Sequence, residues 1–168
     1  MTNPIIELHI SNLGAITIEL EAEKSPKSSA NFLKYLADGH FENTIFHRVI
    51  PGFMIQGGGM TSDLKSKPTN PSIDNEANNG LKNFKYTLAM ARTGDPHSAT
   101  SQFFINIADN DFLNHTSISS TGWGYAVFGK VTSGFDIVDK IASVETTKQG
   151  YHDDVPVEPV MIEKAIAL

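Results

Sequence analysis

The feature that most constrains this chain is an apolar run over residues 46–58, divided by Pro51-Gly52 and followed by glycines. Such a run around a Pro-Gly pair predicts two strands joined by a tight turn. Because side chains alternate across a strand, Arg48 and Ile50 share one face, and so do Met54 and Gln56. If the turn keeps the register, all four lie on one face, which predicts a groove with one cation, one amide and an apolar floor.

A structural interpretation of the same residues stays open. An arginine in a strand often lies at a rim, where its stem covers apolar surface and its head stays in water. Gly57 to Gly59 are compatible with an ordinary turn. They are not a phosphate-binding loop, because the G-x-x-x-x-G-K-[ST] pattern is absent and no helical pattern follows. The residue types alone therefore favour a binding groove without fixing its chemistry.

The composition is that of one globular domain, which we expect to span residues 1–168. Hydrophobic residues make up 40% and charged residues 19% of the chain, a balance that supports a packed core. The net charge of −6 argues against nucleic acid and acidic membranes as partners, because phosphate binding needs clustered Lys and Arg. Since there is no cysteine, disulfides, thiolate metal sites and cysteine nucleophiles are excluded.

The sequence shows no targeting signal for secretion and no membrane-spanning segment. Residues 1–5 lack the basic and apolar segments of a signal peptide. No apolar stretch has the length that a membrane span requires. We therefore expect a cytoplasmic protein.

Apolar periodicity predicts about eight strands. Two of them flank Pro51-Gly52, and the others are expected over residues 5–10, 15–20, 86–92, 101–107, 126–131 and 160–167. The first two of these read as a β-hairpin. Residues 61–83 form a long polar loop, residues 109–125 form another, and residues 150–159 are prone to turns. Many short strands with turns between them are typical of a barrel or a sandwich, and periodicity does not separate the two.

Two segments have helical spacing. Ser25-Pro26 is typical of a helix start, with Ser as the N-cap, and Gly39 is typical of the end. We expect the apolar stripe of this helix to be Ala30, Phe32, Leu33, Leu36 and Ala37. The second helix is expected over residues 135–142, with an apolar face formed by Phe135, Val138 and Ile141.

Three blocks of the sequence resemble the cyclophilin family of peptidyl-prolyl isomerases. Residues 46–58 are similar to the family signature, and residues 90–92 with 101–105 are similar to a second cyclophilin block. Residues 75–83 resemble a stretch of the bacterial members. The likeness spans nearly the whole chain and implies a mainly β fold, a closed eight-stranded antiparallel barrel capped by two α-helices.

The resemblance also implies an activity and partners. The chain is expected to catalyse rotation about X-Pro peptide bonds and to assist protein folding, without a cofactor or a metal. Proline-containing peptides and unfolded or folding proteins are the implied partners of a monomer. The alternative is a non-catalytic proline-peptide-binding or chaperone module that uses the same groove. Hydrolases are poorly supported, because neither H-E-x-x-H nor G-x-S-x-G occurs.

Roles of individual residues follow from the resemblance as well. Arg48 would donate to the prolyl nitrogen, and Gln56 would orient Arg48 and touch the substrate backbone. The apolar cup for the proline ring would be formed by Phe53, Met54, Phe104 and Leu113. Ala91 and Arg92 would contact the substrate, and Gln102 would line a neighbouring pocket.

Phe112 and Tyr125 complete the expected substrate-binding residues, and the chain departs from the family pattern at both of them and at Arg92. Arg92 stands where many members have Asn, and Tyr125 stands where many have a His that borders the proline pocket. Phe112 stands where cyclosporin-sensitive members carry Trp, so we expect weak cyclosporin binding. Trp123 lies in the longer loop and is not the equivalent of that Trp.

Overall fold

The structure is a computed structural model that describes residues 3–168, so residues 1 and 2 of the expected domain lie outside the described part. The main sheet comprises β1 (Ile5–Ile10), β2 (Gly14–Leu20), β3 (Thr44–Ile45), β4 (Arg48–Ile50), β5 (Met54–Gly57), β6 (Thr87–Met90), β7 (Phe103–Asn106), β8 (Val127–Ser133) and β11 (Met161–Ala167). A separate hairpin consists of β9 (Thr146–Gln149) and β10 (His152–Pro156). The α-helices are α1 (Pro26–Ala37) and α2 (Phe135–Ala142), and short 3-10 turns cover Ala77–Asn79 and Asp111–Leu113.

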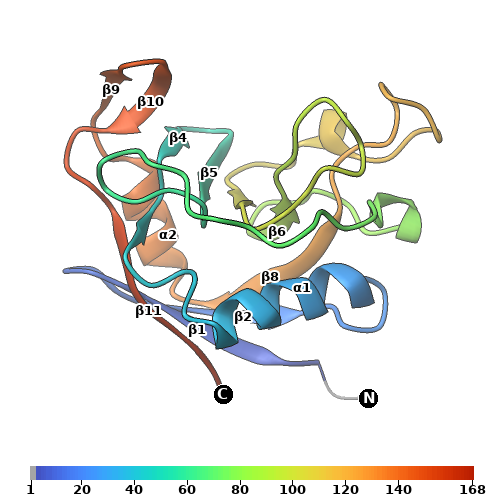
Figure 1. The fold of residues 1–168 in the computed structure, drawn as a ribbon, viewed down its shortest axis with the longest axis horizontal. Helices are drawn as coiled ribbons and strands as arrows, with labels where there is room; N and C mark the ends of the chain where they lie inside the picture. The colour runs from blue at the N-terminus through green and yellow to red at the C-terminus, as the bar shows by residue number, and fades with distance from the viewer. Residues whose placement is uncertain (1–2) are drawn as a thin grey trace.

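The main sheet curls around one apolar core (Figure 1). Its strand order is β3-β11-β1-β2-β8-β6-β7-β5-β4, and every pair is antiparallel. The two marginal strands, β3 and β4, are consecutive in the chain and separated only by Phe46 and His47. They are two halves of one interrupted strand, which joins the margins of the sheet. The predicted mainly β architecture with two helices is confirmed, but the sheet is a curled nine-stranded half-barrel rather than a closed eight-stranded barrel, because one strand is interrupted and its halves β3 and β4 do not pair with each other.

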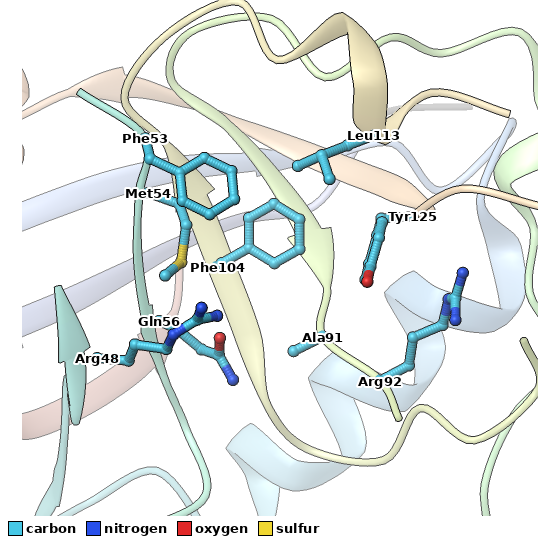
Figure 2. A pocket seen from close by; sticks show the side chains of 9 residues that line it. All are labelled: Arg48, Phe53, Met54, Gln56, Ala91, Arg92, Phe104, Leu113 and Tyr125. Carbon is cyan, nitrogen blue, oxygen red and sulfur yellow. The ribbon is translucent and has the colours of Figure 1, made fainter. Parts of the chain in front are cut away.

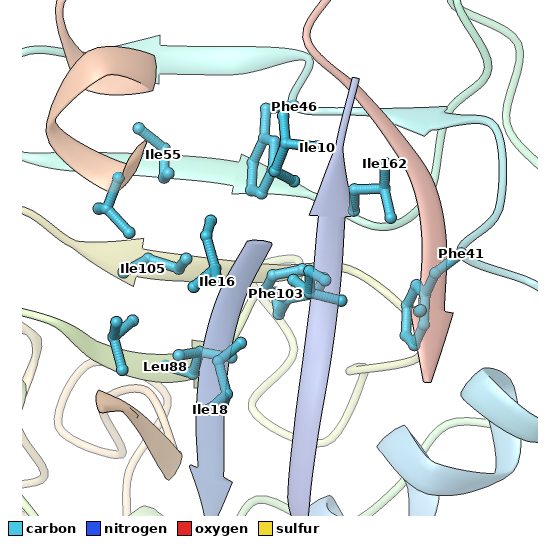
Figure 3. Close-up of a cluster of buried hydrophobic side chains, with 14 of the residues drawn as sticks. Ile10, Ile16, Ile18, Phe41, Phe46, Ile55, Leu88, Phe103, Ile105 and Ile162 are labelled. Atoms are coloured by element: carbon cyan, nitrogen blue, oxygen red, sulfur yellow. The ribbon is translucent and has the colours of Figure 1, made fainter. Parts of the chain in front are cut away.

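The core lies on the inner face of the curled sheet. Figure 3 shows side chains from opposite parts of the sheet meeting there, among them Ile16, Phe46 and Ile105. Phe32 of α1 packs against Phe41, with ring centroids 4.7 Å apart, and α1 thereby covers part of this core. The predicted hairpin is confirmed, because β1 and β2 pair from Ile5 with Glu19 to Ile10 with Gly14.

Helix α1 begins where predicted, but its capping differs. The Ser25 hydroxyl donates to the Val127 carbonyl at 2.6 Å instead of capping the helix. The Glu76 carboxylate accepts from the Lys27 and Ser28 backbone N–H groups at 3.2 and 2.7 Å. An acidic group at a helix N-terminus satisfies free N–H donors and opposes the helix dipole. The long polar loop therefore supplies the cap.

The buried faces of both helices were predicted only in part. The buried residues of α1 are Ser28, Ser29, Phe32 and Tyr35, while the predicted Ala30 and Ala37 are exposed. Helix α2 has the predicted bounds, but it buries Ile137, Val138, Ile141 and Ala142. Phe135 is 40% exposed, and its ring lies on Tyr86 at 4.8 Å. In both helices the buried face differs from the predicted apolar stripe. The small alanines of α1 and the first residue of α2 are apolar but exposed.

The loops wrap around the sheet. Residues 61–83 touch α1 through the Tyr35 hydroxyl, which accepts from the Asn70 backbone N–H at 2.9 Å. Further along, Ile73 forms an isolated bridge with Ala99. The hairpin β9-β10 was not predicted, because its short polar strands pair only with each other. Within residues 3–168, neither α-helix has the length and apolar character that crossing a bilayer requires.

Candidate active site

The strands β4 and β5 bring the polar and apolar residues of the central run onto one face. Arg48 pairs with Gln56, and Ile50 pairs with Met54, so the predicted shared face is confirmed. The turn between the strands holds this register. The Phe53 N–H donates to the Ile50 carbonyl at 3.1 Å, and Gly52 has φ +74°. A type II turn requires a positive φ at its third residue and favours Pro at its second, as Pro51 and Gly52 provide.

Two further strands extend this outer face. Phe104 of β7 stands opposite Gln56 of β5 and Ala89 of β6. Their neighbours Ile55, Ile105 and Leu88 point into the barrel core, so Phe104 points outward. Met54, Phe104 and Leu113 belong to a second apolar cluster on the outside of the sheet. The strands are therefore apolar on both faces, the outer face being covered by loops.

The outer cluster surrounds a small pocket (Figure 2). It encloses about 150 Å³, well below the roughly 300–1,000 Å³ of pockets for drug-sized ligands. A space of this size suits one side chain. Its lining residues are Arg48, Phe53, Met54, Gln56, Ala91, Arg92, Phe104, Leu113 and Tyr125.

Arg48 and Gln56 supply the polar edge of the pocket. Arg48 is exposed, and within residues 3–168 its guanidinium has no hydrogen bond or ion pair. The Gln56 Nε2 donates to Gln102 Oε1 at 2.9 Å. The Gln56 amide group is therefore held by Gln102, next to the cross-strand partner Arg48. Gln102 lines the adjoining hollow together with Ser98 and Thr100.

Arg92 and Tyr125 form the opposite wall. The guanidinium of Arg92 lies 4.4 Å from the centre of the Tyr125 ring, and that ring meets Phe104 edge-on at 5.7 Å. Arg92 Nε and Nη2 both donate to the Gly124 carbonyl at 3.1 Å. The Nδ2 of Asn75 donates to the same carbonyl at 3.0 Å. These bonds fix the wall against the sheet.

Comparison with known proteins explains this arrangement. Residues 5–167 match the family model described as cyclophilin type peptidyl-prolyl cis-trans isomerase. The chain is 59% identical over 160 residues to the peptidyl-prolyl cis-trans isomerase cyp18 of Streptomyces antibioticus, covering 95% of this chain and 96% of that protein. It is 58% identical over 153 residues to peptidyl-prolyl cis-trans isomerase B of Escherichia coli, covering 91% and 93%. The chain belongs to the cyclophilin family.

The fold comparison agrees. A Cryptosporidium parvum cyclophilin type peptidyl-prolyl cis-trans isomerase superposes with a TM-score of 0.80 at 28% identity, covering 99% of this chain and 98% of that one. A second structure of that protein, in the presence of the dipeptide Ala-Pro, has a TM-score of 0.79. The present chain, as a cyclophilin, is itself a peptidyl-prolyl cis-trans isomerase.

Phe112 lies beside the pocket of this cyclophilin and does not line it. Its side chain is 74% exposed, and its ring stacks on Phe53 with centroids 5.6 Å apart. It lines an outer hollow of about 450 Å³ beneath the long loop. Trp123 is distinct from this position, because it packs between His97 and His115 at 4.9 and 5.2 Å.

Sequence reasoning missed a buried asparagine network beneath the pocket. Asn83 Nδ2 reaches the Leu113 and Tyr125 carbonyls at 3.3 Å, and its Oδ1 accepts from Asn106 at 3.0 Å. The Asn110 amide donates to Asn106 Oδ1 at 2.8 Å and to the Phe53 carbonyl at 2.9 Å. The network ties three pocket residues together. The only signal in the sequence was an excess of Asn in its polar loops.

His47 lies behind Arg48. Burial lowers the pKa of His47 to about 4, with smaller contributions from His152 and Arg48. Its Nδ1 is buried and has no hydrogen-bond partner within residues 3–168. Over the same residues, no group of three or more potential metal-binding His, Cys, Asp or Glu side chains comes together.

Proposed function

We propose that Arg48 drives the isomerisation by donating a hydrogen bond to the prolyl nitrogen of the twisted amide. The unpaired guanidinium of Arg48 beside an apolar pocket of one side chain's size carries this proposal. The C. parvum relative, whose structure was determined in the presence of Ala-Pro, supports proline as the ring that enters the pocket.

The physical chemistry of the X-Pro bond explains why one donor is enough. Amide resonance sets a rotation barrier of roughly 18–20 kcal/mol. In the twisted amide the prolyl nitrogen regains a lone pair and becomes a hydrogen-bond acceptor. A donor that meets only this state lowers the barrier rather than tightening ground-state binding. An acceleration of ~10⁴–10⁵ requires about 5–7 kcal/mol of such stabilisation.

The remaining pocket residues hold the substrate in this mechanism. Phe53, Met54, Phe104 and Leu113 form the cup for the proline ring, and Tyr125 closes its far side. Gln56, fixed by its bond to Gln102, offers its amide oxygen to the substrate backbone. Ala91 lies on the floor and leaves room for the residue before proline.

The proposal extends to partners and setting. The clients are proline-containing peptides and unfolded or folding proteins, bound by a monomer in the cytoplasm without a cofactor. Cyclosporin binds weakly, because Phe112 lacks the N–H donor that a tryptophan offers at this position.

The test is an Arg48→Ala variant assayed by exchange between the cis and trans forms of a proline peptide. We expect a loss of most of the catalysis with an intact fold, because Arg48 is exposed and leaves no cavity. Arg48→Lys should also be poor, since an ammonium does not reproduce the planar fork. Lys164→Ala, which removes an exposed cation of β11 outside the pocket, is the matched control and should keep its turnover. Near-normal turnover in folded Arg48→Ala would refute the mechanism.

The same assay separates catalysis from passive binding. A non-catalytic module would bind the peptide, as seen by calorimetry, while leaving its exchange rate at the uncatalysed value. Acceleration by the unmodified protein excludes that alternative.

A further inference from the structure

The groove around the pocket has a charge opposite to that of the whole chain. The chain carries 19 Asp and Glu against 13 Lys and Arg, and its net charge is −6. Its only two arginines, Arg48 and Arg92, both line the groove. Three adjoining hollows make up this groove, and none of their lining residues is Asp or Glu. The groove is thus a cationic strip on an acidic protein.

Arg92 is common to the three hollows. It lines the proline pocket, the hollow next to Gln102 and the outer hollow beneath the long loop. A charge at this position therefore faces residues of a bound peptide outside the proline pocket. Arg48, in contrast, lines only the proline pocket.

The guanidinium of Arg92 is held in place and still has donors to offer. Its Nε and Nη2 donate to the Gly124 carbonyl, and its Nη1 donates to the Thr93 carbonyl at 2.9 Å. A guanidinium has five N–H donors, so three bonds leave two. A cation–π contact with the Tyr125 ring also holds the group. Little side-chain entropy remains to be lost when an anion binds.

The neutral groups around Arg92 suit an anionic partner as well. Hydroxyl groups of Thr93, Ser98 and Thr100 line one hollow, and those of Thr116, Ser120 and Thr121 line the other. Two acidic residues lie near Arg92. Asp95 Oδ1 accepts from the His97 backbone N–H, and Asp74, which lines a further small hollow together with Arg92, is paired with Lys27 at 2.7 Å. Neither residue lines the three hollows of the groove.

We propose that Arg92 selects clients in which an aspartate or glutamate lies within two residues of the isomerised proline. The carboxylate binds the two free N–H donors of Arg92, while the proline ring occupies the cup. This inference rests on the proposed function of the pocket and assigns a substrate class to it. Charge-assisted bonds to a fixed guanidinium are stronger than bonds between neutral groups. The long-range attraction also favours encounter with acidic segments.

The experiment uses an alanine peptide with one proline, in which each position within two residues is replaced in turn by Glu or Lys. Values of kcat/KM are measured by NMR exchange at low salt, which avoids a coupling protease. At one or more positions we expect the Glu peptide to exceed the Ala peptide by roughly three- to tenfold. The Lys peptide should fall below the Ala peptide. High salt should bring the ratios toward one.

Variants separate Arg92 from the general charge of the protein. In Arg92→Gln, the Glu-to-Ala ratio should fall to about one, whatever happens to the absolute rates. Arg92→Lys keeps the charge without the fork, and its ratio should lie in between. Lys164→Gln changes the net charge equally at an exposed residue of β11 outside the groove, and should keep the full ratio.

The outcomes are distinct. Ratios near one at every position in the unmodified protein would overturn the proposal, and so would a ratio that survives in Arg92→Gln. If the unmodified protein did not accelerate even the Ala peptide, the proposed function of the pocket would fail instead.

Discussion

His47 illustrates how one buried residue couples stability to pH. Burial lowers its pKa to about 4, whereas an unfolded histidine titrates near 6.5. Between these values the unfolded chain binds a proton that the folded chain does not, so the free energy of unfolding rises with pH. The stabilisation is complete above the unfolded pKa and is lost as the pH falls toward the folded pKa.

We therefore predict that acidification from pH 6.5 to pH 4 costs the fold about 3 kcal/mol through His47. Urea unfolding across this range measures it. His47→Phe fills a similar volume without a titrating group, and its stability should depend less steeply on pH. Some slope should remain, because burial also lowers the pKa of His40. An unchanged slope in His47→Phe would contradict the assignment.

Phe112 is a second single residue whose effect can be predicted. Its exposed ring offers an apolar face beside the pocket, but no hydrogen-bond donor. We predict weak cyclosporin inhibition, because a drug carbonyl left without a partner costs about 1–3 kcal/mol, or roughly five- to 150-fold in affinity. Phe112→Trp should strengthen binding, measured by titration calorimetry, without a matching gain in turnover. Ile118→Trp adds an exposed indole elsewhere in the loop and should not.

Single elements could be predicted from the sequence where the two faces of a strand carry different residue types. The hairpin of β1 and β2 and the face shared by Arg48 and Gln56 follow from alternation. The positions of Phe103 and Phe104 on opposite faces of β7 do not, because every residue of that strand is buried. The cap of α1 by Glu76 and the bond of Gln56 to Gln102 join residues 46 or more positions apart. Local patterns do not encode such pairings.

The asparagine network links several segments around the pocket, and its role can be tested at Asn83. Asn83 Nδ2 faces acceptors only, the carbonyls of Leu113 and Tyr125 and the Asn114 Oδ1. In Asn83→Asp, an ionised carboxylate would face the same oxygens, whereas the protonated acid could still donate to one. We expect the activity of Asn83→Asp to be low at neutral pH and to recover as the pH falls.

The pH profile distinguishes positioning of the pocket from general destabilisation. The free energy of unfolding, measured in parallel, gives the folded fraction by which the activity is normalised. Asn79→Asp is the matched control, because the Asn79 amide bonds the Lys24 carbonyl and the Ser25 hydroxyl near the start of α1. Its normalised activity should show no such recovery. If Asn83→Asp behaved in the same way, the network would have no role in shaping the pocket.

The whole molecule separates a core inside the barrel from a functional cluster outside it. Ile55, Ile105 and Leu88 fill the inner face, and Met54 and Phe104 stand on the outer face of the same strands. This arrangement requires close packing between neighbouring segments of the sheet, as at Gly58. It has φ +91°, and a Cβ there would lie 2.8 Å from the Phe103 ring. The barrel was predicted from the resemblance to cyclophilins, since strand periodicity alone does not distinguish a barrel from a sandwich.

The chemistry that this architecture supports has no titrating participant near neutrality. The proposed donor is a guanidinium, and the rest of the pocket lining consists of the Gln56 amide, the Arg92 guanidinium, the Tyr125 phenol and apolar side chains. We predict that kcat/KM on a non-titrating peptide is nearly flat across roughly pH 6–8 and insensitive to chelators. Below that range, lost activity should follow the unfolded fraction. A bell-shaped profile between pH 6 and pH 8, at constant folded fraction, would require a general acid or base outside this mechanism.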